Sequence, residues 1–246
     1  MKEIIPIPFF KPFPVSCGTT TRHFPLKVAR THQLSQEEVF LSHGLKFLNL
    51  TSAKWIQAEQ VHGDTIAFVD ATTPSACSAI TLLENVDGLL TQRADHTLSI
   101  LTADCLPIFF YLGNPPAVGL VHAGWRGTAK GIARHAVSGF KRLAKHRCHE
   151  LHVAFGPSIG GCCYEVGEEF QDLFPESLEE REGRFYLDLV QENRRQLLEA
   201  GLLPGQIGPA GPCTGCHLEN FYSYRKEGNR AYRMLSWILL PNSPEI

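Results

Sequence analysis

Short apolar runs recur along the chain between segments rich in glycine, proline and polar residues. Runs of this length and composition are typical of buried β-strands. Strands are predicted at residues 66–69, 98–101, 108–112, 118–122, 151–155 and 234–240. Two of these runs flank the turn Gly113-Asn-Pro-Pro116, which predicts a β-hairpin. An antiparallel pair would bring Cys105, before the first strand, close to His122, at the end of the second.

Apolar residues at helical spacing predict three helices, at residues 127–145, 187–200 and 165–174. Thr128 is the expected N-cap of the first helix, and Gly201 is the expected C′ residue of the second. Strands and helices are interspersed without strict βαβ alternation. This order favours a mixed α+β fold over a doubly wound sheet.

Length and composition describe an ordinary globular protein with no electrostatic reason to bind nucleic acid or a membrane surface. The chain has 246 residues, of which 43% are hydrophobic and 20% charged, and a net charge of -2. Four prolines interrupt the apolar N-terminus, and no run approaches the ~18 apolar residues of a membrane span. We therefore expect a cytoplasmic protein with a small-molecule substrate and reduced thiols.

Three residues lie in unusual glycine- or proline-containing contexts: His62 in Gln-Val-His-Gly, Cys105 in Thr-Ala-Asp-Cys-Leu-Pro, and His122 in Val-His-Ala-Gly-Trp-Arg-Gly. Two imidazoles and a thiolate suit zinc, and three protein ligands leave a fourth position open, as in catalytic zinc sites. Taken singly, each of them is more often structural. Their shared position beside turns at strand ends favours a joint site, which makes the chain an enzyme if the three meet in space.

Two neighbours of these residues are further candidates. Asp104 either orients a metal ligand or acts as a general base, whereas the alternative is a turn carboxylate that caps backbone N–H groups. Arg126 lies at the start of the helix predicted from residue 127, where a guanidinium and free N–H groups suit an anion such as phosphate. The alternative is that Trp125 is a core residue and Arg126 is solvated.

The remaining cysteine motifs are not assigned by the sequence. Cys213-Thr-Gly-Cys216-His217 matches haem attachment, but that chemistry takes place outside the cytoplasm. It also resembles half of a zinc ribbon, yet no second C-x-x-C occurs in the chain, so a structural or site-lining turn is favoured. The vicinal pair Cys162-Cys163 has no predicted role.

Taken together, the motifs of the chain resemble those of the YfiH family, whose members have been named purine nucleoside phosphorylase, polyphenol oxidoreductase (laccase) and peptidoglycan editing factor. The resemblance extends from Thr20 to Arg233. The segments that carry it are Gln60-Val-His62-Gly, Asp87-Gly-Leu-Leu-Thr91, Thr102-Ala-Asp104-Cys105-Leu-Pro107, His122-Ala-Gly-Trp125-Arg126-Gly127, Gly156-Pro-Ser-Ile-Gly160, Tyr164-Glu165-Val166-Gly167, Cys213-Thr214 and Phe221-Tyr-Ser-Tyr-Arg225.

This resemblance implies a single domain over residues 1–246, in which mixed β-sheets pack face to face with helices outside, a four-layer α/β/β/α arrangement. It also implies a zinc ion held by His62, Cys105 and His122, with copper as the less favoured metal. We expect Asp104, Cys105 and Arg126 to be catalytic. Arg22, Arg126 and Arg225 are the candidates for holding phosphate or substrate.

The activity implied is phosphorolysis of adenosine, inosine and 5′-methylthioadenosine, with deamination of adenosine as a second reaction. Its partners would be a purine nucleoside and phosphate. A first alternative is an amidase that edits a peptidoglycan precursor with the same metal or with Cys105 as nucleophile. Copper-dependent phenol oxidation and a non-catalytic binding role are the remaining alternatives.

Overall fold

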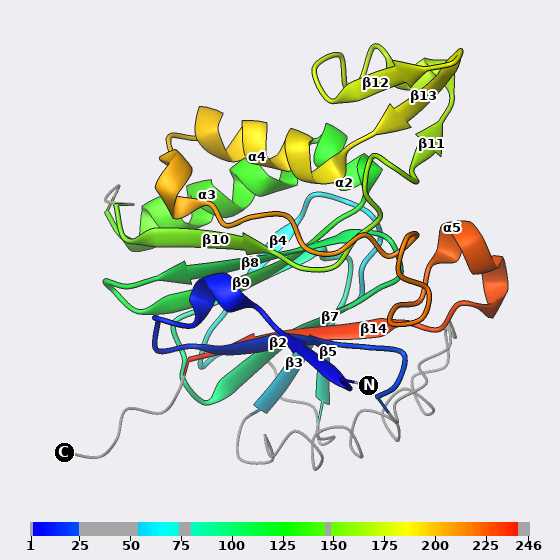
Figure 1. The fold of residues 1–246 in the computed structure, drawn as a ribbon. Helices are drawn as coiled ribbons and strands as arrows, with labels where there is room; N and C mark the ends of the chain where they lie inside the picture. The colour runs from blue at the N-terminus through cyan, green and yellow to red at the C-terminus, as the bar shows by residue number, and fades with distance from the viewer. Residues whose placement is uncertain (1, 25–53, 74–79, 146–148, 241–246) are drawn as a thin grey trace.

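The structure is a computed structural model that describes residues 2–24, 54–73, 80–145 and 149–240. Within these residues, the strands form three β-sheets (Figure 1). The largest has the strand order β1-β2-β14-β7-β3-β5. It contains β1 (Ile4–Pro6), β2 (Ser16–Thr20), β3 (Lys54–Ala58), β5 (Ile80–Leu83), β7 (His96–Thr102) and β14 (Met234–Leu239). The strand β3 runs parallel to β5 and β7, and the other pairs are antiparallel.

A second sheet, of five strands, contains the predicted hairpin. Its order is β10-β8-β9-β6-β4. The strands are β4 (Ile66–Val69), β6 (Gly88–Thr91), β8 (Leu106–Leu112), β9 (Ala117–Ala123) and β10 (Leu151–Phe155). Antiparallel pairing of β8 with β9 runs from Leu112 opposite Ala117 to Leu106 opposite Ala123, which confirms the hairpin.

Three α-helices of the described residues lie over one face of this five-stranded sheet (Figure 1). They are α2 (Trp125–Ala129), α3 (Ile132–Leu143) and α4 (Leu189–Glu199), and the short α5 (Tyr224–Glu227) lies apart from them. Within the described ranges, 3-10 turns cover Pro8–Phe10, Glu168–Phe170, Pro204–Gln206 and Gly228–Arg230. A small third sheet of β11 (Glu165–Val166), β12 (Leu178–Arg181) and β13 (Arg184–Leu187) projects beyond α4.

The strands β8 and β9 are almost entirely apolar, because the five-stranded sheet is covered on both faces. In β8, Ile108 and Phe110 pack with Phe140 of α3, whereas Phe109 and Tyr111 pack toward the six-stranded sheet. A strand buried on both sides has no solvent face, so the usual polar alternation is lost. Each fully buried side chain of this size stabilises the fold by roughly 1.5–3 kcal/mol.

The mixed α+β class and the face-to-face packing of two sheets are confirmed. Helices, five-stranded sheet and six-stranded sheet supply three of the four expected layers (Figure 1). Among the described residues, no α-helix covers the outer face of the six-stranded sheet. A single domain over the whole chain stays a prediction, since residues 25–53 lie outside the described part.

The helix predicted at residues 127–145 is in fact two helices. Gly131 has a φ of +81°, in the left-handed region that glycine adopts without strain, and it separates α2 from α3. The prediction of Thr128 as N-cap was wrong, because α2 already begins at Trp125 with Gly124 as its N-cap. Thr128 is buried inside the helix, where its hydroxyl accepts a hydrogen bond from Asn193 of α4.

The other two helix predictions had opposite outcomes. The helix predicted at residues 187–200 is confirmed as α4, with Asp188 accepting from the Gln191 N–H as N-cap and Gly201 at a φ of +95° after its end. The prediction of a helix at residues 165–174 was wrong. In that segment the strand β11 ends at Val166, and a 3-10 turn begins after Gly167, whose backbone is extended.

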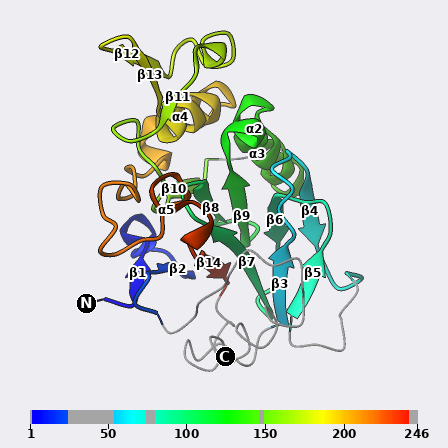
Figure 2. The same ribbon diagram turned by 90° about the vertical axis from the view of Figure 1, so that its right-hand side faces the viewer.

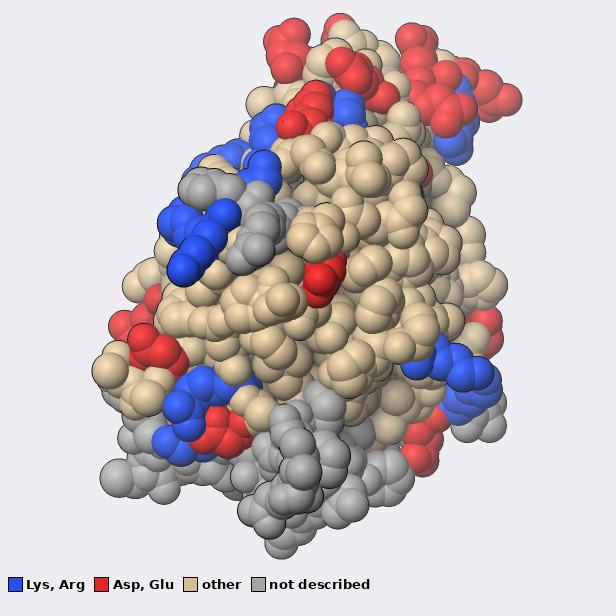
Figure 3. Space-filling view, turned by 90° about the vertical axis from the view of Figure 1, so that its left-hand side faces the viewer, with Lys and Arg blue, Asp and Glu red and all other residues tan. Residues whose placement is uncertain are grey.

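The left-hand face of the molecule in Figure 1 is drawn with its charges in Figure 3. Charged side chains of both signs lie around the rim of this face, and the broad centre is largely uncharged.

No helix within the described residues is long and apolar enough to cross a membrane.

Candidate metal centre

The hairpin brings Cys105 and His122 together as the sequence predicts. Pro107 of β8 lies opposite His122 of β9, and Cys105 immediately precedes β8. The Cys105 thiol is partly buried and the His122 ring is almost wholly buried. Figure 2 faces this side of the molecule, where α2 and α5 flank the region of β8 and β9.

His62 reaches the same place from the loop between β3 and β4. The loop is held by Asp87, just before β6, whose carboxylate accepts hydrogen bonds from the backbone N–H groups of His62 and Gly63 at 2.9 and 2.7 Å. His62 itself has a φ of +59°, which is uncommon for a residue with a side chain. These charge-assisted hydrogen bonds offset the cost of the left-handed backbone, so one buried carboxylate shapes the loop.

The same carboxylate orients the second histidine. Asp87 Oδ1 lies 2.8 Å from Nδ1 of His122, and both side chains are buried. A histidine that binds a metal ion through one ring nitrogen usually donates from the other to a carboxylate. This contact therefore leaves Nε2 of His122 as the nitrogen available for a metal ion.

The three side chains converge closely enough to share one ion. Ligand atoms of His62, Cys105 and His122 all lie within 4.8 Å of one another. The two imidazole rings meet edge to face, with their centroids 4.8 Å apart. A Cβ at Gly124 would lie 3.1 Å from the Cys105 sulfur, so glycine leaves space beside it. Donor types, convergence and the oriented carboxylate all fit a zinc ion.

The electrostatics of this set favour a thiolate. Burial by itself would raise the pKa of the Cys105 thiol, but the charge and hydrogen bonds of His122 and His62 lower it to about 6. Burial would likewise lower the pKa of His122, but the charge of Cys105 and the Asp87 hydrogen bond raise it to about 9. The thiolate is both the metal-binding and the nucleophilic form of cysteine.

The helix α2 is packed tightly against the His62 loop. A Cβ at Gly127 would lie only 2.6 Å from the carbonyl oxygen of Gly63, so only glycine allows this approach. Arg126 is exposed, and its guanidinium lies 4.3 Å from the Trp125 ring centroid. Because α2 has five residues, its helix dipole adds little to anion binding, and Arg126 itself is the candidate anion ligand.

Asp104 lies beside Cys105 but has two hydrogen-bond partners of its own. Its carboxylate accepts from the Thr214 hydroxyl and from the backbone N–H of Arg225, each at 2.6 Å. Its φ of +89° places it in a strained region of the backbone. These contacts match the turn-capping alternative, and a catalytic role for Asp104 stays a prediction.

The two remaining candidate arginines, Arg225 and Arg22, have different contacts and lie in different places. The guanidinium of Arg225 lies 5.0 Å from the Tyr164 ring centroid and donates to the Glu165 carbonyl. Arg22 donates to Glu227 at 2.6 Å and to the carbonyl of Leu218. Arg225 therefore borders the metal centre, whereas Arg22 holds α5 in place by an ion pair.

The sequence did not assign roles to two residues of this centre. Asp87 was part of a recognised motif, and the signal for its role is a carboxylate directly before a buried apolar strand. Tyr164 is close enough that the charges of Cys105, Arg225 and Arg126 all act on it. Burial above all, and then the charge of Cys105, raise the pKa of its phenol to about 12, so it stays protonated at neutral pH.

Fold and site together define an α+β protein with a His–Cys–His ligand set oriented by a buried carboxylate. The family model described as "multi-copper polyphenol oxidoreductase laccase" matches residues 30–241, and the chain belongs to this family. Two curated relatives are both named purine nucleoside phosphorylase YlmD. The one from Geobacillus stearothermophilus is 39% identical over 75% of this chain and 72% of its own length. The one from Bacillus subtilis is 32% identical over 77% and 72%.

Solved structures show the same fold. The hypothetical protein YfiH of Bacillus licheniformis superposes with a TM-score of 0.87 at 29% identity, covering 98% of this chain and 97% of that one. YlmD from Geobacillus stearothermophilus superposes with a TM-score of 0.85 at 32% identity, over 96% and 94% of the two chains. The resemblance to the YfiH family is therefore confirmed.

Proposed function

We propose that the chain is a zinc-dependent purine nucleoside phosphorylase that accepts adenosine, inosine and 5′-methylthioadenosine and also deaminates adenosine. The observation that carries the proposal is the convergence of His62, Cys105 and His122 within 4.8 Å, with Asp87 behind His122. The names of the curated relatives support phosphorolysis. A purine nucleoside and phosphate would then be the substrates.

His62, Cys105 and His122 would hold the zinc ion. Bound there, zinc would supply a Lewis acid beside the reacting purine. Asp87 would keep the His122 ring in the tautomer and orientation that the metal requires. The partly buried thiolate of Cys105 adds negative charge, which strengthens the hold on a divalent cation.

Phosphorolysis forms a bond between a phosphate oxygen and the ribose anomeric carbon while the bond to the purine breaks. Arg126 and Arg225 lie around Tyr164 and would bind the phosphate by charge-assisted hydrogen bonds. Tyr164 keeps its proton at neutral pH and would donate a hydrogen bond to phosphate or to the departing purine. Asp104 would position Arg225 through the backbone N–H that it accepts.

The direct test is incubation of the purified protein with adenosine, with and without phosphate. We expect adenine and ribose 1-phosphate only when phosphate is present, and inosine in both reactions. The variant His62→Ala should lose both activities, whereas Cys17→Ala, in β2 of the other sheet, should retain them. Absence of both products with the wild-type protein would refute the proposal.

Metal dependence needs its own test. Removal of zinc should abolish turnover, and added zinc should restore it. Full activity in protein stripped below about one-tenth equivalent of zinc would exclude the zinc mechanism. If activity toward phenols scales with added copper and disappears in zinc-loaded protein, phenol oxidation is a side effect of copper bound in place of zinc.

One observation favours the amidase as a second candidate. Cys105 lies beside His122, with Asp87 behind the imidazole, and the lowered pKa of Cys105 and raised pKa of His122 favour a thiolate–imidazolium pair, as in a cysteine nucleophile. This candidate predicts release of an amino acid from a peptidoglycan precursor by metal-free protein. It also predicts that alkylation of Cys105 in the metal-free protein ends that activity.

A further inference from the structure

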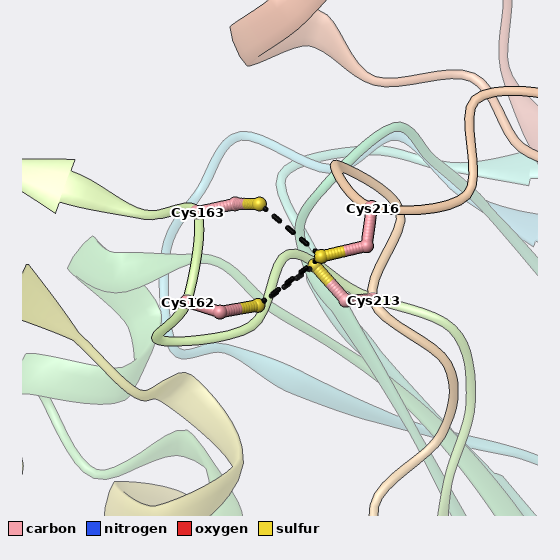
Figure 4. Close-up of side chains that lie close together, drawn as sticks. All are labelled: Cys162, Cys163, Cys213 and Cys216. Atoms are coloured by element: carbon pink, nitrogen blue, oxygen red, sulfur yellow. Dashed lines mark hydrogen bonds between the residues drawn. The ribbon is translucent and has the colours of Figure 1, made fainter.

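Four cysteines outside the metal centre form a second cluster. Cys162 and Cys163 lie on one loop, and Cys213 and Cys216 lie on another, with their sulfurs pointing toward a common centre (Figure 4). All four sulfurs lie within 4.8 Å of one another. The vicinal pair Cys162-Cys163 thus takes the place that a second C-x-x-C motif would have in a zinc ribbon.

The sulfur–sulfur distances within the cluster are close to those between cysteine ligands of one metal ion. The Cys162–Cys216, Cys163–Cys216 and Cys162–Cys213 sulfur pairs are 3.4, 3.5 and 3.6 Å apart. Tetrahedral zinc with zinc–sulfur bonds of about 2.3 Å places its ligand sulfurs about 3.8 Å from one another. A disulfide would need one pair at about 2.05 Å, and no pair is set apart from the others in this way.

The compactness of the cluster indicates one ion. An iron–sulfur cluster distributes its cysteines over two or more iron atoms, which spreads the ligand sulfurs further apart than those of a mononuclear site. An all-thiolate, tetrahedral set is the usual ligand set of structural zinc.

The backbone is built around these sulfurs. The N–H groups of Gly160 and Cys216 donate to the Cys213 sulfur, the first of them at 3.2 Å. Such hydrogen bonds stabilise a thiolate that binds a metal ion. A Cβ at Gly215 would lie 2.8 Å from Cβ of Cys163, so a glycine is required where the two loops meet.

Two cationic side chains, Arg181 and Lys226, lie near the cluster. Arg181 donates to the carbonyl of Gly161, next to Cys162, and its positive charge interacts with Cys162. The Cε atom of Lys226 lies 3.6 Å from the position that a Cβ on Gly215 would take. Four thiolates and one divalent ion carry a net negative charge, which these cations partly offset.

We propose that Cys162, Cys163, Cys213 and Cys216 bind a second, structural zinc ion in a mononuclear tetrahedral site. This ion pins together the loops at residues 156–164 and 211–217, which are already joined where the Thr214 N–H donates to the Ser158 carbonyl at 3.0 Å. The site is independent of the proposed function, since none of its ligands belongs to the His62–Cys105–His122 set.

The second site also supports the first. Cys213 is followed by Thr214, whose hydroxyl holds Asp104, and Cys163 is followed by Tyr164, which lies under Arg225. An ion that fixes both loops therefore fixes the side chains beside Cys105. Loss of this zinc should impair substrate binding while the His62 set keeps its metal.

Metal counting by native mass spectrometry tests the proposal. Wild-type protein should carry two zinc ions per chain, and the variants Cys162→Ser/Cys216→Ser and His62→Ala/Cys105→Ala should each carry one. The control Cys17→Ala changes a cysteine of β2 that belongs to neither cluster of the described residues, and it should carry two. Equal metal content in the wild type and in Cys162→Ser/Cys216→Ser would overturn the proposal.

Two measurements avoid reliance on variants that fail to fold. Cys162 and Cys216 are exposed, so iodoacetamide can reach both sulfurs, and zinc-bound thiolates should be alkylated only after chelation. Rapid alkylation of both in the native wild type, or a disulfide within the cluster, would overturn the site. Cobalt substitution of the His62→Ala/Cys105→Ala variant should give intense thiolate-to-cobalt absorption. Iron bound there in place of zinc would refute the assignment of zinc.

Discussion

Asp87 Oδ1 lies 2.8 Å from Nδ1 of His122, and the same carboxylate accepts hydrogen bonds from the backbone N–H groups of Val61, His62 and Gly63. One buried side chain thus holds two of the three candidate metal ligands, His122 through its ring and His62 through its loop. Burial would raise the pKa of Asp87, but the hydrogen bond and charge of His122 keep it below its ordinary value. Its ionised form is therefore part of the site.

The variant Asp87→Asn should bind zinc at the His62 set about 10–100-fold more weakly. An amide has one acceptor oxygen, so it cannot accept from both His122 and Gly63. Zinc affinity is measured by chelator competition in a Cys162→Ser/Cys216→Ser background, which removes the four-cysteine cluster. Asp172→Asn, at an exposed position, is the control and should match the parent protein. Unchanged affinity in Asp87→Asn would show that Asp87 does not orient the ligands.

The variant Gly127→Ala should destabilise the protein and weaken zinc binding. Its Cβ would lie 2.6 Å from the Gly63 carbonyl oxygen, which forces α2 away from the His62 loop. Overpacking of this kind costs about 1–3 kcal/mol, more than the helix propensity that alanine adds. In Gly205→Ala the new Cβ meets no atom within 4 Å, so this control should unfold like the wild type. A higher melting temperature for Gly127→Ala would contradict the close approach.

The variant Thr214→Val should raise KM for the nucleoside or phosphate by about tenfold, with both metals retained. It removes the 2.6 Å hydrogen bond to Asp104 Oδ1 and leaves a buried acceptor, at a cost of about 1–3 kcal/mol. Steady-state kinetics together with metal counting check this. Thr72→Val, on an exposed turn, should change neither quantity. Loss of a metal ion from Thr214→Val would indicate a structural defect instead.

Glu192 should make stability depend on pH. Burial would raise the pKa of this carboxyl, but hydrogen bonds from Arg195, Gln196 and Ser177 keep it below its ordinary value. A pKa that is lower in the folded state adds stability above the unfolded value, and this is lost as the pH falls toward the folded pKa. Glu192→Gln should therefore be less stable by about 1–3 kcal/mol at pH ~7.

The difference between Glu192→Gln and the wild type should shrink as the pH falls below ~4. Urea unfolding of both proteins at pH ~7 and at a pH below ~4 measures this difference in the free energy of unfolding. The exposed Glu168→Gln is the control, and its stability should follow the wild type at each pH. A stability difference for Glu192→Gln that stays constant with pH would exclude the ionised carboxylate as its source.

Local sequence patterns predicted several elements whose stability is local or whose burial is complete, but they missed the largely buried strands β3 and β6. The hairpin of β8 and β9 follows from two apolar runs around a glycine–proline turn, and α4 follows from its N-cap and from Gly201. Short edge strands such as β11 and β12 are only half buried and escaped prediction. The break at Gly131 was missed because the apolar spacing continues across it.

By itself, the sequence determined which residue types form the candidate metal centre, and one contact between them. It supplied two histidines and a cysteine beside turns, and the hairpin register placed Cys105 next to His122. Tertiary structure decided the rest, because the remaining contacts join residues far apart in the chain. Asp87 brings the His62 loop to the hairpin, and Cys162 and Cys163 meet Cys213 and Cys216 across two loops. Local spacing cannot encode such pairs, since they depend on how separate strands pack into sheets.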